Sequence, residues 1–143
     1  MPYDSAQLFQ LSQKELDDLF GASQVGPIPD GEADGTAIIA AGKPYSQEIA
    51  TLINYFAWQG KIFDSKAGFL KNRIGAFGLN AIIARVYKAP SWLDGKECIV
   101  LDYSETSLIA HRIRDEIRLI SAQLYLGKVY WEREHIFDFT LKF

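Results

Sequence analysis

The chain has 143 residues, a net charge of −3 and an isoelectric point near 5.3. This length suits one domain with a sizeable core, and 48% hydrophobic against 23% charged residues excludes an intrinsically disordered chain. The acidic balance offers no basic stripe to a phosphate backbone, so we expect no nucleic-acid partner. The cluster of Arg112, Arg114 and Arg118 is interleaved with Asp115 and Glu116, which favours a self-compensated surface.

The number of cysteines and the length of the apolar segments indicate where in the cell the protein is expected. Cys98 is the single cysteine, so no intrachain disulfide can form, which fits a reducing, cytoplasmic setting. The segment from Met1 to Ser5 lacks the basic and apolar regions of a signal peptide. Apolar runs such as 37–41 are far shorter than the roughly 20 residues that span a bilayer. We therefore expect a cytoplasmic protein without a membrane span, with a homodimer as an open alternative to a monomer.

The N-terminal part reads as a helical arm followed by a strap. Residues 4–21 have helical character, and Ser12 with Glu15 forms a capping box that satisfies backbone N–H groups of a first turn. Gly21 is a fitting helix stop. Two prolines within 25–31 forbid regular structure there. We expect one domain over 1–143, with the arm and strap in 1–34 and a barrel in 35–143.

From residue 35 onward the pattern is mostly that of short strands. Residues 35–41 read as a strand, and Ser46 could cap a second helix with apolar positions at helical spacing up to Phe56. Asp94-Gly95 is a strong hairpin-turn signal, and Pro90 should end the strand before it. The period of two that follows the second helix predicts strands at 57–64, 68–74, 79–88 and 97–103.

The last third is ambiguous at its start and clear at its end. Residues 106–120 fit a helix face and a strand equally well, and periodicity alone cannot decide between them. We favour a strand beginning near Ile113 because of the family resemblance described below. Residues 124–131 and 135–143 read as strands joined by a turn at 132–134. In the last strand the alternation assigns one face to His135, Phe137, Phe139, Leu141 and Phe143, and the solvent side to Asp138, Thr140 and Lys142.

About seven strands with hairpin turns predict a mainly β protein, α+β by content, with one or two short N-terminal helices. Closure into an antiparallel barrel is favoured because it removes the exposed edges of a sheet this large. No nucleotide-binding motif occurs, and His111 and His135 belong to no metal-ligand pair, so we expect neither a cofactor nor a metal. Cys98 lies in an apolar strand, where a small buried side chain is the favoured interpretation over a reactive thiol.

Three segments contain residues that could take part in ligand binding or catalysis. Trp58-Gln59-Gly60-Lys61 would allow a ligand close to the indole, or else is a packed Trp beside a bulge. Asp102 is an acid on an apolar strand and needs a partner, for which Arg85, Arg112 and Arg114 are candidates; a structural ion pair is favoured over catalysis. The charge row in 113–118 would orient a ligand if it pointed inward, but an outward, solvated face is favoured.

The order of several segments resembles a group of uncharacterised bacterial proteins with lipocalin-like, calycin-type barrels, and distantly the proteins that carry a GxWxG motif. The likeness spans 35–143, although Ala57-Trp58-Gln59-Gly60 departs from a full Gly-x-Trp-x-Gly. The resemblance implies a central cavity for a small hydrophobic molecule and carries over no catalytic residue. The segments that carry it are 58–63, Asp94-Gly95, 100–104, 113–118, 124–131 and Asp138-Phe139.

Binding of a small hydrophobic or aromatic ligand in a barrel cavity is therefore the leading hypothesis, because an eight-stranded barrel is about wide enough for one such molecule. Arg85 or Arg114 would meet a ligand carboxylate. The aromatic side chains expected to contact the ligand are Trp58, Tyr87, Tyr103, Tyr125 and Tyr130.

Two other classes of function stay open. A small isomerase, cyclase or hydratase would use one acid and one Tyr or Lys in an apolar pocket, with Asp102 and Tyr103, or Asp115 and Lys61, as candidates. An accessory interaction module would use an exposed Trp92 or Trp131. Binding is favoured over catalysis because no motif specifies a reaction.

Overall fold

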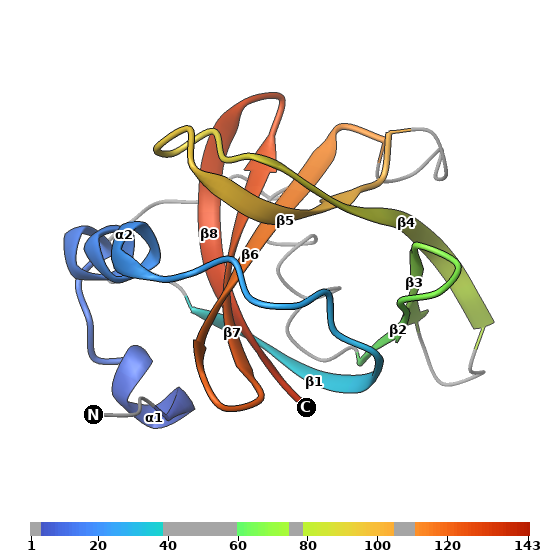
Figure 1. Cartoon of the computed structure of the whole chain (residues 1–143), viewed down its shortest axis with the longest axis horizontal. Helices are drawn as coiled ribbons and strands as arrows, with labels where there is room; N and C mark the ends of the chain where they lie inside the picture. Colours follow the sequence, from blue (N-terminus) through green and yellow to red (C-terminus); the bar gives the residue numbers. More distant parts are fainter. Residues whose placement is uncertain (1–3, 39–59, 75–78, 105–110) are drawn as a thin grey trace.

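A closed barrel of eight antiparallel strands makes up most of the chain in the computed structural model (Figure 1), which describes residues 4–38, 60–74, 79–104 and 111–143. Each strand pairs with the next, and β8 pairs with β1 to close the ring. The prediction of a mainly β, closed antiparallel barrel is confirmed. The strands are β1 Gly31–Ile38, β2 Lys61–Asp64, β3 Phe69–Ile74, β4 Leu79–Pro90, β5 Glu97–Asp102, β6 Ile113–Ser121, β7 Leu124–Trp131 and β8 Glu134–Lys142.

Two short helices precede the barrel, α1 Ser5–Leu8 and α2 Gln13–Ala22. The predicted capping box at Ser12 is present, since its side chain accepts from the Glu15 backbone and the Glu15 side chain accepts in return. Gly21 does not stop the helix, which continues through Ala22. The first strand begins at Gly31, earlier than the predicted start at residue 35.

The segment from Ile113, which fitted a helix and a strand equally well, forms a strand, as we favoured. β6 starts at Ile113 and pairs with β5 and β7, so the alternating interpretation of this segment wins over the helical one. Asp94-Gly95 lies in the predicted hairpin between β4 and β5, where Gly95 has a φ of 75°. A positive φ at this position is accessible to glycine without a side-chain clash.

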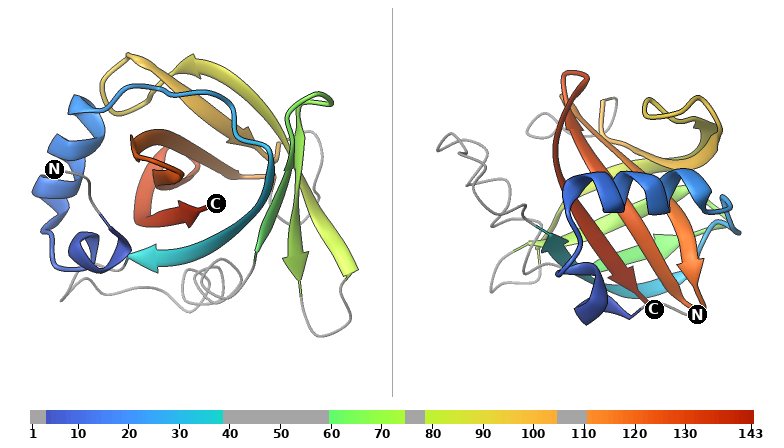
Figure 2. Two further views of the ribbon diagram at one scale, coloured as in Figure 1. Left: turned by 60° about the horizontal axis from the view of Figure 1, so that its bottom comes forward. Right: turned by 90° about the vertical axis from the view of Figure 1, so that its left-hand side faces the viewer.

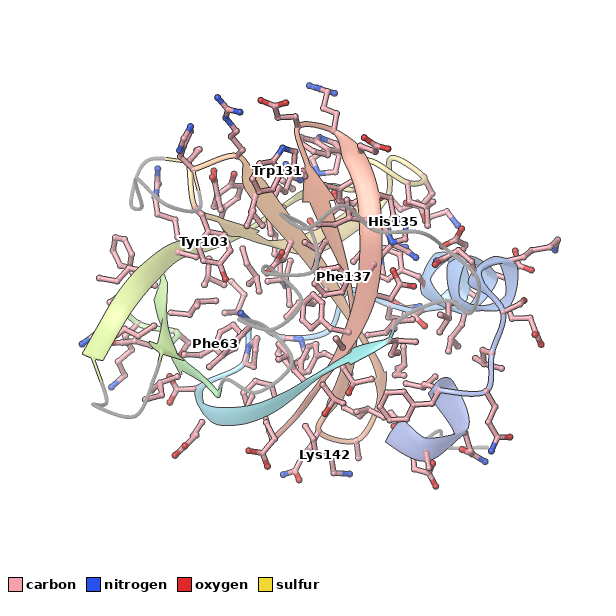
Figure 3. All side chains as sticks on the ribbon, turned by 180° about the vertical axis from the view of Figure 1, so that it is seen from behind. Phe63, Tyr103, Trp131, His135, Phe137 and Lys142 are labelled. Atoms are coloured by element: carbon pink, nitrogen blue, oxygen red, sulfur yellow. The ribbon has the colours of Figure 1, made fainter. Side chains whose placement is uncertain are left out.

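The inner face of the barrel is lined mainly by apolar side chains. Figure 3 labels three of them, Phe63, Tyr103 and Phe137, which come from different parts of the ring. Alternation along each strand puts every second residue on this face. The buried interior residues are Ala33, Phe63, Leu70, Ala84, Val86, Ile99, Leu101, Tyr103, Ile113, Ile117, Tyr125, Val129, Ile136, Phe137, Phe139 and Leu141.

A second core lies outside the ring, because α2 crosses the outer face of the strands nearest the C-terminus (Figure 2). Leu16 and Phe20 of α2 are buried with Val100 and Leu126 on this face. The prediction that Asp138 and Thr140 face solvent is therefore wrong. They point outward but are buried, with exposed fractions of 0% and 1%, and Gln13 of α2 covers and binds Asp138.

A β-bulge in β8 also separates His135 from the face that we assigned to it. Val129 pairs with Phe137 and Tyr130 pairs with His135, so Ile136 is an extra residue that shifts the register. Phe137 stays inside, whereas His135 contacts the outward Asp138 and the Tyr130 ring. The predicted face was wrong for His135 because the alternation was continued through the adjacent apolar residues Ile136 and Phe137, where the strand holds an extra residue.

Several expectations fall on residues outside the described ranges. These are the second helix after Ser46, the residue Trp58, and the segment 106–110. Among the described residues, no helix is long and apolar enough to cross a membrane.

Candidate functional site

Among the side chains that the structure describes, Lys61, Tyr103 and Asp115 are polar and point into a mainly apolar interior. Lys61 begins β2 and lies opposite Ala33 of β1; Asp115 of β6 lies opposite Leu101 of β5. Tyr103 follows Leu101 by two residues, so it continues the inner face beyond the end of β5. Three separate segments thus bring an amine, a phenol and a carboxyl group to one place. We call Lys61, Tyr103 and Asp115 the interior trio.

The interior trio forms a hydrogen-bonded chain. Lys61 Nζ donates to Tyr103 Oη over 3.1 Å, and Tyr103 Oη lies 3.5 Å from Asp115 Oδ2, a separation at which a hydrogen bond is weak. The exposed fractions are 2% for Lys61 and 0% for the other two. The phenol therefore stands between the amine and the carboxyl group, and all three are shielded from bulk water.

Burial moves the pKa values of Lys61 and Asp115 toward 7. Removal from water lowers the pKa of Lys61 to about 8, against the attraction of Asp115, which raises it. Burial raises the pKa of Asp115 to about 7, against the attraction of Lys61 and the Tyr103 hydrogen bond. Asp115 Oδ1 is buried and has no hydrogen-bond partner among the described residues. The interior trio thus holds one acceptor that the described protein leaves unsatisfied.

The wall beside the interior trio is aromatic. Lys61 Nζ lies 5.8 Å from the ring centre of Tyr103 and 6.0 Å from that of Phe139. Phe139 pairs directly with Gly127 on β7, and its ring occupies the space above that glycine: a Cβ there would come within 2.2 Å of the ring. The absence of a side chain at Gly127 is what lets the tip of the Phe139 ring occupy this space.

Most of the other predicted site residues lie on the outer face of the barrel. Tyr87 donates a 2.7 Å hydrogen bond to Asp102, and Arg85 pairs in register with Asp102. Hydrogen bonds from Ser104 and Tyr87 hold the pKa of Asp102 below its ordinary value although burial opposes them. The structural interpretation of Asp102 therefore has support, and its predicted pairing with Tyr103 does not form, because neighbours in a strand face opposite ways.

Arg114 and Tyr130 also point outward. Arg114 binds Glu116 at 3.0 Å and stacks 4.3 Å from the centre of the Trp92 ring. Tyr130 meets the Trp92 ring edge-on at 5.2 Å. Trp92 is 37% exposed, and the Arg133 guanidinium covers it as well. These residues form one outer aromatic and cationic cluster rather than the lining of the interior.

Of the remaining predicted residues, Tyr125 faces inward and Trp58 lies outside the described residues. Tyr125 donates through its hydroxyl to the Pro27 carbonyl at 2.7 Å, so the strap holds it near one end of the barrel. The structure therefore brings Lys61, Tyr103 and Asp115 together, with Tyr125 on the same inner face. It does not bring Arg85, Tyr87, Asp102, Arg114 or Tyr130 to that face.

A second set of buried charges attaches α2 to the barrel, and sequence reasoning missed it. Lys128 Nζ contacts Asp17 of α2 and Asp138 of β8, the latter at 3.1 Å. Gln13 of α2 donates to Asp138 at 3.0 Å, and His135 Nε2 lies 2.5 Å from it. A strand that reads as solvent-facing gives no sign that a helix covers it. Within the described residues, no group of three His, Cys, Asp or Glu side chains is placed to hold a metal ion.

The chain matches no known family model and no curated protein. Among solved structures, it is similar to the crystal structure of a protein from Thermomonospora curvata, with a TM-score of 0.58 and 13% sequence identity. The match covers 99% of this chain and 88% of the other chain. At this identity the likeness concerns the fold alone. Fold and site together define an eight-stranded antiparallel barrel with a buried amine, phenol and carboxyl group inside it.

Proposed function

We propose that the protein is a lipocalin-like barrel that binds a small, mostly apolar molecule inside, with the polar group of that molecule at Lys61, Tyr103 and Asp115. The observation that carries the proposal is the buried Asp115 Oδ1, which lacks a partner among the described residues and lies in a mainly apolar interior. An unsatisfied buried acceptor costs about 1–3 kcal/mol. Native proteins leave few buried polar groups unsatisfied, so this one needs an explanation, and a ligand that supplies the missing donor would provide it.

A purely structural role explains the interior trio less well. A buried ion pair offsets its desolvation only when its geometry is close and its remaining lone pairs are satisfied. Here the amine reaches the carboxyl group through Tyr103, and the last contact is 3.5 Å long. Ionisable groups that burial shifts toward neutral pH are more frequent at functional sites than elsewhere. The arrangement supports a binding role over a stabilising one.

The chemistry of the interior trio indicates the ligand class. Asp115 Oδ1 needs a donor, while Lys61 and Tyr103 can donate to an oxygen. A hydroxyl group serves both needs, since it donates once and accepts twice. The apolar walls, with Phe63, Phe137 and Phe139, suit an alkyl chain or an aromatic ring. We therefore expect an alcohol, a hydroxylated ring or a related carbonyl compound of modest size.

Thermal-shift titrations with 1-octanol, benzyl alcohol and octane test the proposal. The two alcohols should raise the melting temperature of the wild type in a saturable manner, and octane should do so less. Asp115→Leu should abolish the difference between alcohol and alkane. The matched control is Asp102→Leu, which changes an acid on the outer face. Equal stabilisation by octane, or the loss of alcohol binding in both variants, would contradict the proposal.

An enzyme of isomerase, cyclase or hydratase type is the second candidate. The observation that favours it is an Asp115 carboxyl with a pKa of about 7, within reach of a tyrosine and without an arginine partner among the described residues. Such a group can act as a general base or acid at neutral pH. Exchange of the α-protons of an added ketone in D₂O, followed by NMR, would separate catalysis from binding. Asp115→Asn should stop that exchange.

A further inference from the structure

We propose that Lys61 captures an aldehyde or ketone covalently, as an imine, inside the barrel. The inference rests on the proposed binding of a ligand in the interior, and adds a covalent bond between that ligand and Lys61. Its basis is geometric: the Lys61 amine is 2% exposed, faces the apolar interior and lies 3.1 Å from the Tyr103 hydroxyl, which in turn reaches Asp115. An amine attacks a carbonyl carbon only when it is neutral, and a desolvated lysine meets that condition.

The steps need no oxidant or cofactor. The nitrogen lone pair of neutral Lys61 forms a bond to the carbonyl carbon while the carbonyl π bond breaks and its oxygen takes a proton. The nitrogen then loses its two hydrogens as protons, the hydroxyl group leaves as water after taking a second proton, and a C=N double bond remains. The sum is amine plus carbonyl giving imine plus water. Both protons required on oxygen are balanced by the two that leave nitrogen.

Tyr103 and Asp115 are placed to move these protons. The phenol lies between the amine and the carboxyl group, so it can pass a proton from one to the other. The pKa of Asp115 is about 7, so near neutral pH the carboxyl group is present in both its acid and its base form. The pKa of Lys61 is about 8, so about a quarter of the amine is neutral at pH 7.5, against about one part in a thousand for an ordinary lysine.

The other fully buried lysine of the described chain shows what distinguishes Lys61. Lys128 is 0% exposed, but its ammonium contacts two carboxylates directly, Asp17 and Asp138. It also points outward beneath α2, away from the interior. Lys61 contacts the Tyr103 hydroxyl and lies near the rings of Tyr103 and Phe139 on the inner face. Burial alone would predict labelling of both lysines, whereas the proposal predicts labelling of Lys61 only.

The test is reductive trapping on the full chain with octanal or benzaldehyde and sodium cyanoborohydride at pH 7.5, with peptide mapping of the modified lysines. Lys61 should be labelled more than about tenfold faster than exposed lysines such as Lys71, given the larger neutral fraction of its amine. Lys61→Arg should abolish that label, and Lys71→Arg is the matched control. Tyr103→Phe should slow the labelling of Lys61, whereas exposed lysines such as Lys71 should be labelled at the wild-type rate.

The outcomes separate this inference from the proposed function. A Lys61 adduct supports both. Stabilisation by 1-octanol without a Lys61 adduct overturns covalent capture and leaves interior binding intact, and adducts confined to exposed lysines have the same meaning. If 1-octanol does not stabilise the protein and no Lys61 adduct forms, both the proposed function and covalent capture are overturned. If Lys61→Arg fails to fold, the pH profile of wild-type labelling serves instead, and it should rise between pH 7 and 8.5 as the amine is deprotonated.

Discussion

Asp115 and Glu116 are neighbours in β6, yet they lie on opposite sides of the barrel wall. Asp115 faces the interior with Tyr103, whereas Glu116 faces outward and accepts hydrogen bonds from the Ser91 hydroxyl at 2.6 Å and the Trp92 backbone at 2.8 Å. Both carboxyl groups are fully buried. Glu116 also binds Arg114, while Asp115 has one oxygen without a partner among the described residues. Burial is common to both acids, and only one is left for a ligand.

Removing the charges of the interior trio should stabilise the protein near neutral pH. We expect Lys61→Met with Asp115→Leu to raise the free energy of unfolding by about 1–4 kcal/mol at pH 7.5, as replacements of buried ion pairs often do. The measurement is urea unfolding at pH 5, 7.5 and 10. The control Lys14→Gln with Asp18→Asn removes an exposed pair, and the change should stay within about 0.5 kcal/mol.

The pH dependence of this gain follows from the two shifted groups. The pKa of Asp115 is raised from 3.8 to about 7, so its contribution to stability is present below pH 3.8 and is lost as pH rises to 7. The pKa of Lys61 is lowered from 10.5 to about 8, so its contribution is present above pH 10.5 and is lost as pH falls to 8. The advantage of the double variant should therefore peak between pH 7 and 8. A gain independent of pH would contradict these shifts.

Gly127→Ala should destabilise the barrel because the new methyl group would collide with the Phe139 ring. We expect a loss of about 1–3 kcal/mol, the usual cost of overpacking a core. Phe139→Leu should relieve the clash, so the double variant should lose less than the two single changes added together. Chemical unfolding of all four proteins measures this coupling. Simple additivity would show that the ring does not lie over the glycine.

Arg118→Met should cost about 1–3 kcal/mol, because it removes the charge-assisted hydrogen bonds of a buried guanidinium to the partly exposed Asp94. The Arg118 guanidinium holds both oxygens of Asp94, at 2.7 and 2.8 Å, and the Phe20 carbonyl at the end of α2. Its hydrogen bonds keep the pKa of Asp94 below the ordinary value. Stability from Asp94 is thus present at neutral pH and is lost as pH falls through that lowered pKa, and the variant should lack this acid dependence. Arg112→Met, at a half-exposed pair, should change stability by less than about 0.5 kcal/mol.

Asp138→Asn should loosen α2 from the barrel. Asp138 is fully buried and holds Lys128, Gln13 and His135, and the hydrogen bonds of His135 and Lys128 keep its pKa low although burial opposes them. We expect a loss of about 3 kcal/mol and faster amide exchange in α2. Asp17→Asn should cost less, because Asp17 is 37% exposed. Equal losses, or unchanged exchange in α2, would mean that this cluster does not attach the helix.

The alternation of residues predicted the barrel well because it reports which face of a strand is apolar. It placed β5, β7 and β8 nearly at their observed bounds, whereas for β6 only the family resemblance favoured a strand from Ile113. It could not show the bulge at Ile136 or the helix over Asp138, since both depend on contacts between distant parts of the chain. The alternation along a strand indicates which residues share a face, but it does not show which other element packs on that face.

The site was predicted only in part for the same reason. Lys61, Tyr103 and Asp115 were all candidates, but the pairing of Asp102 with Tyr103 put two strand neighbours in one site although they face opposite ways. Aromatic content alone selected Tyr87 and Tyr130, which the structure places outside. Strand parity, applied to Asp102 and Tyr103, would have shown that these two cannot share one site.

Interior binding is tested most directly by NMR titration of ¹⁵N-labelled protein with 1-octanol, benzyl alcohol and octanal. Saturable shifts of backbone amide signals should be largest at Lys61, Tyr103 and Asp115 and small at outer residues such as Tyr87 and Trp92. Shifts confined to the outer face, or the absence of saturable shifts with all three probes, would contradict a ligand held inside the barrel.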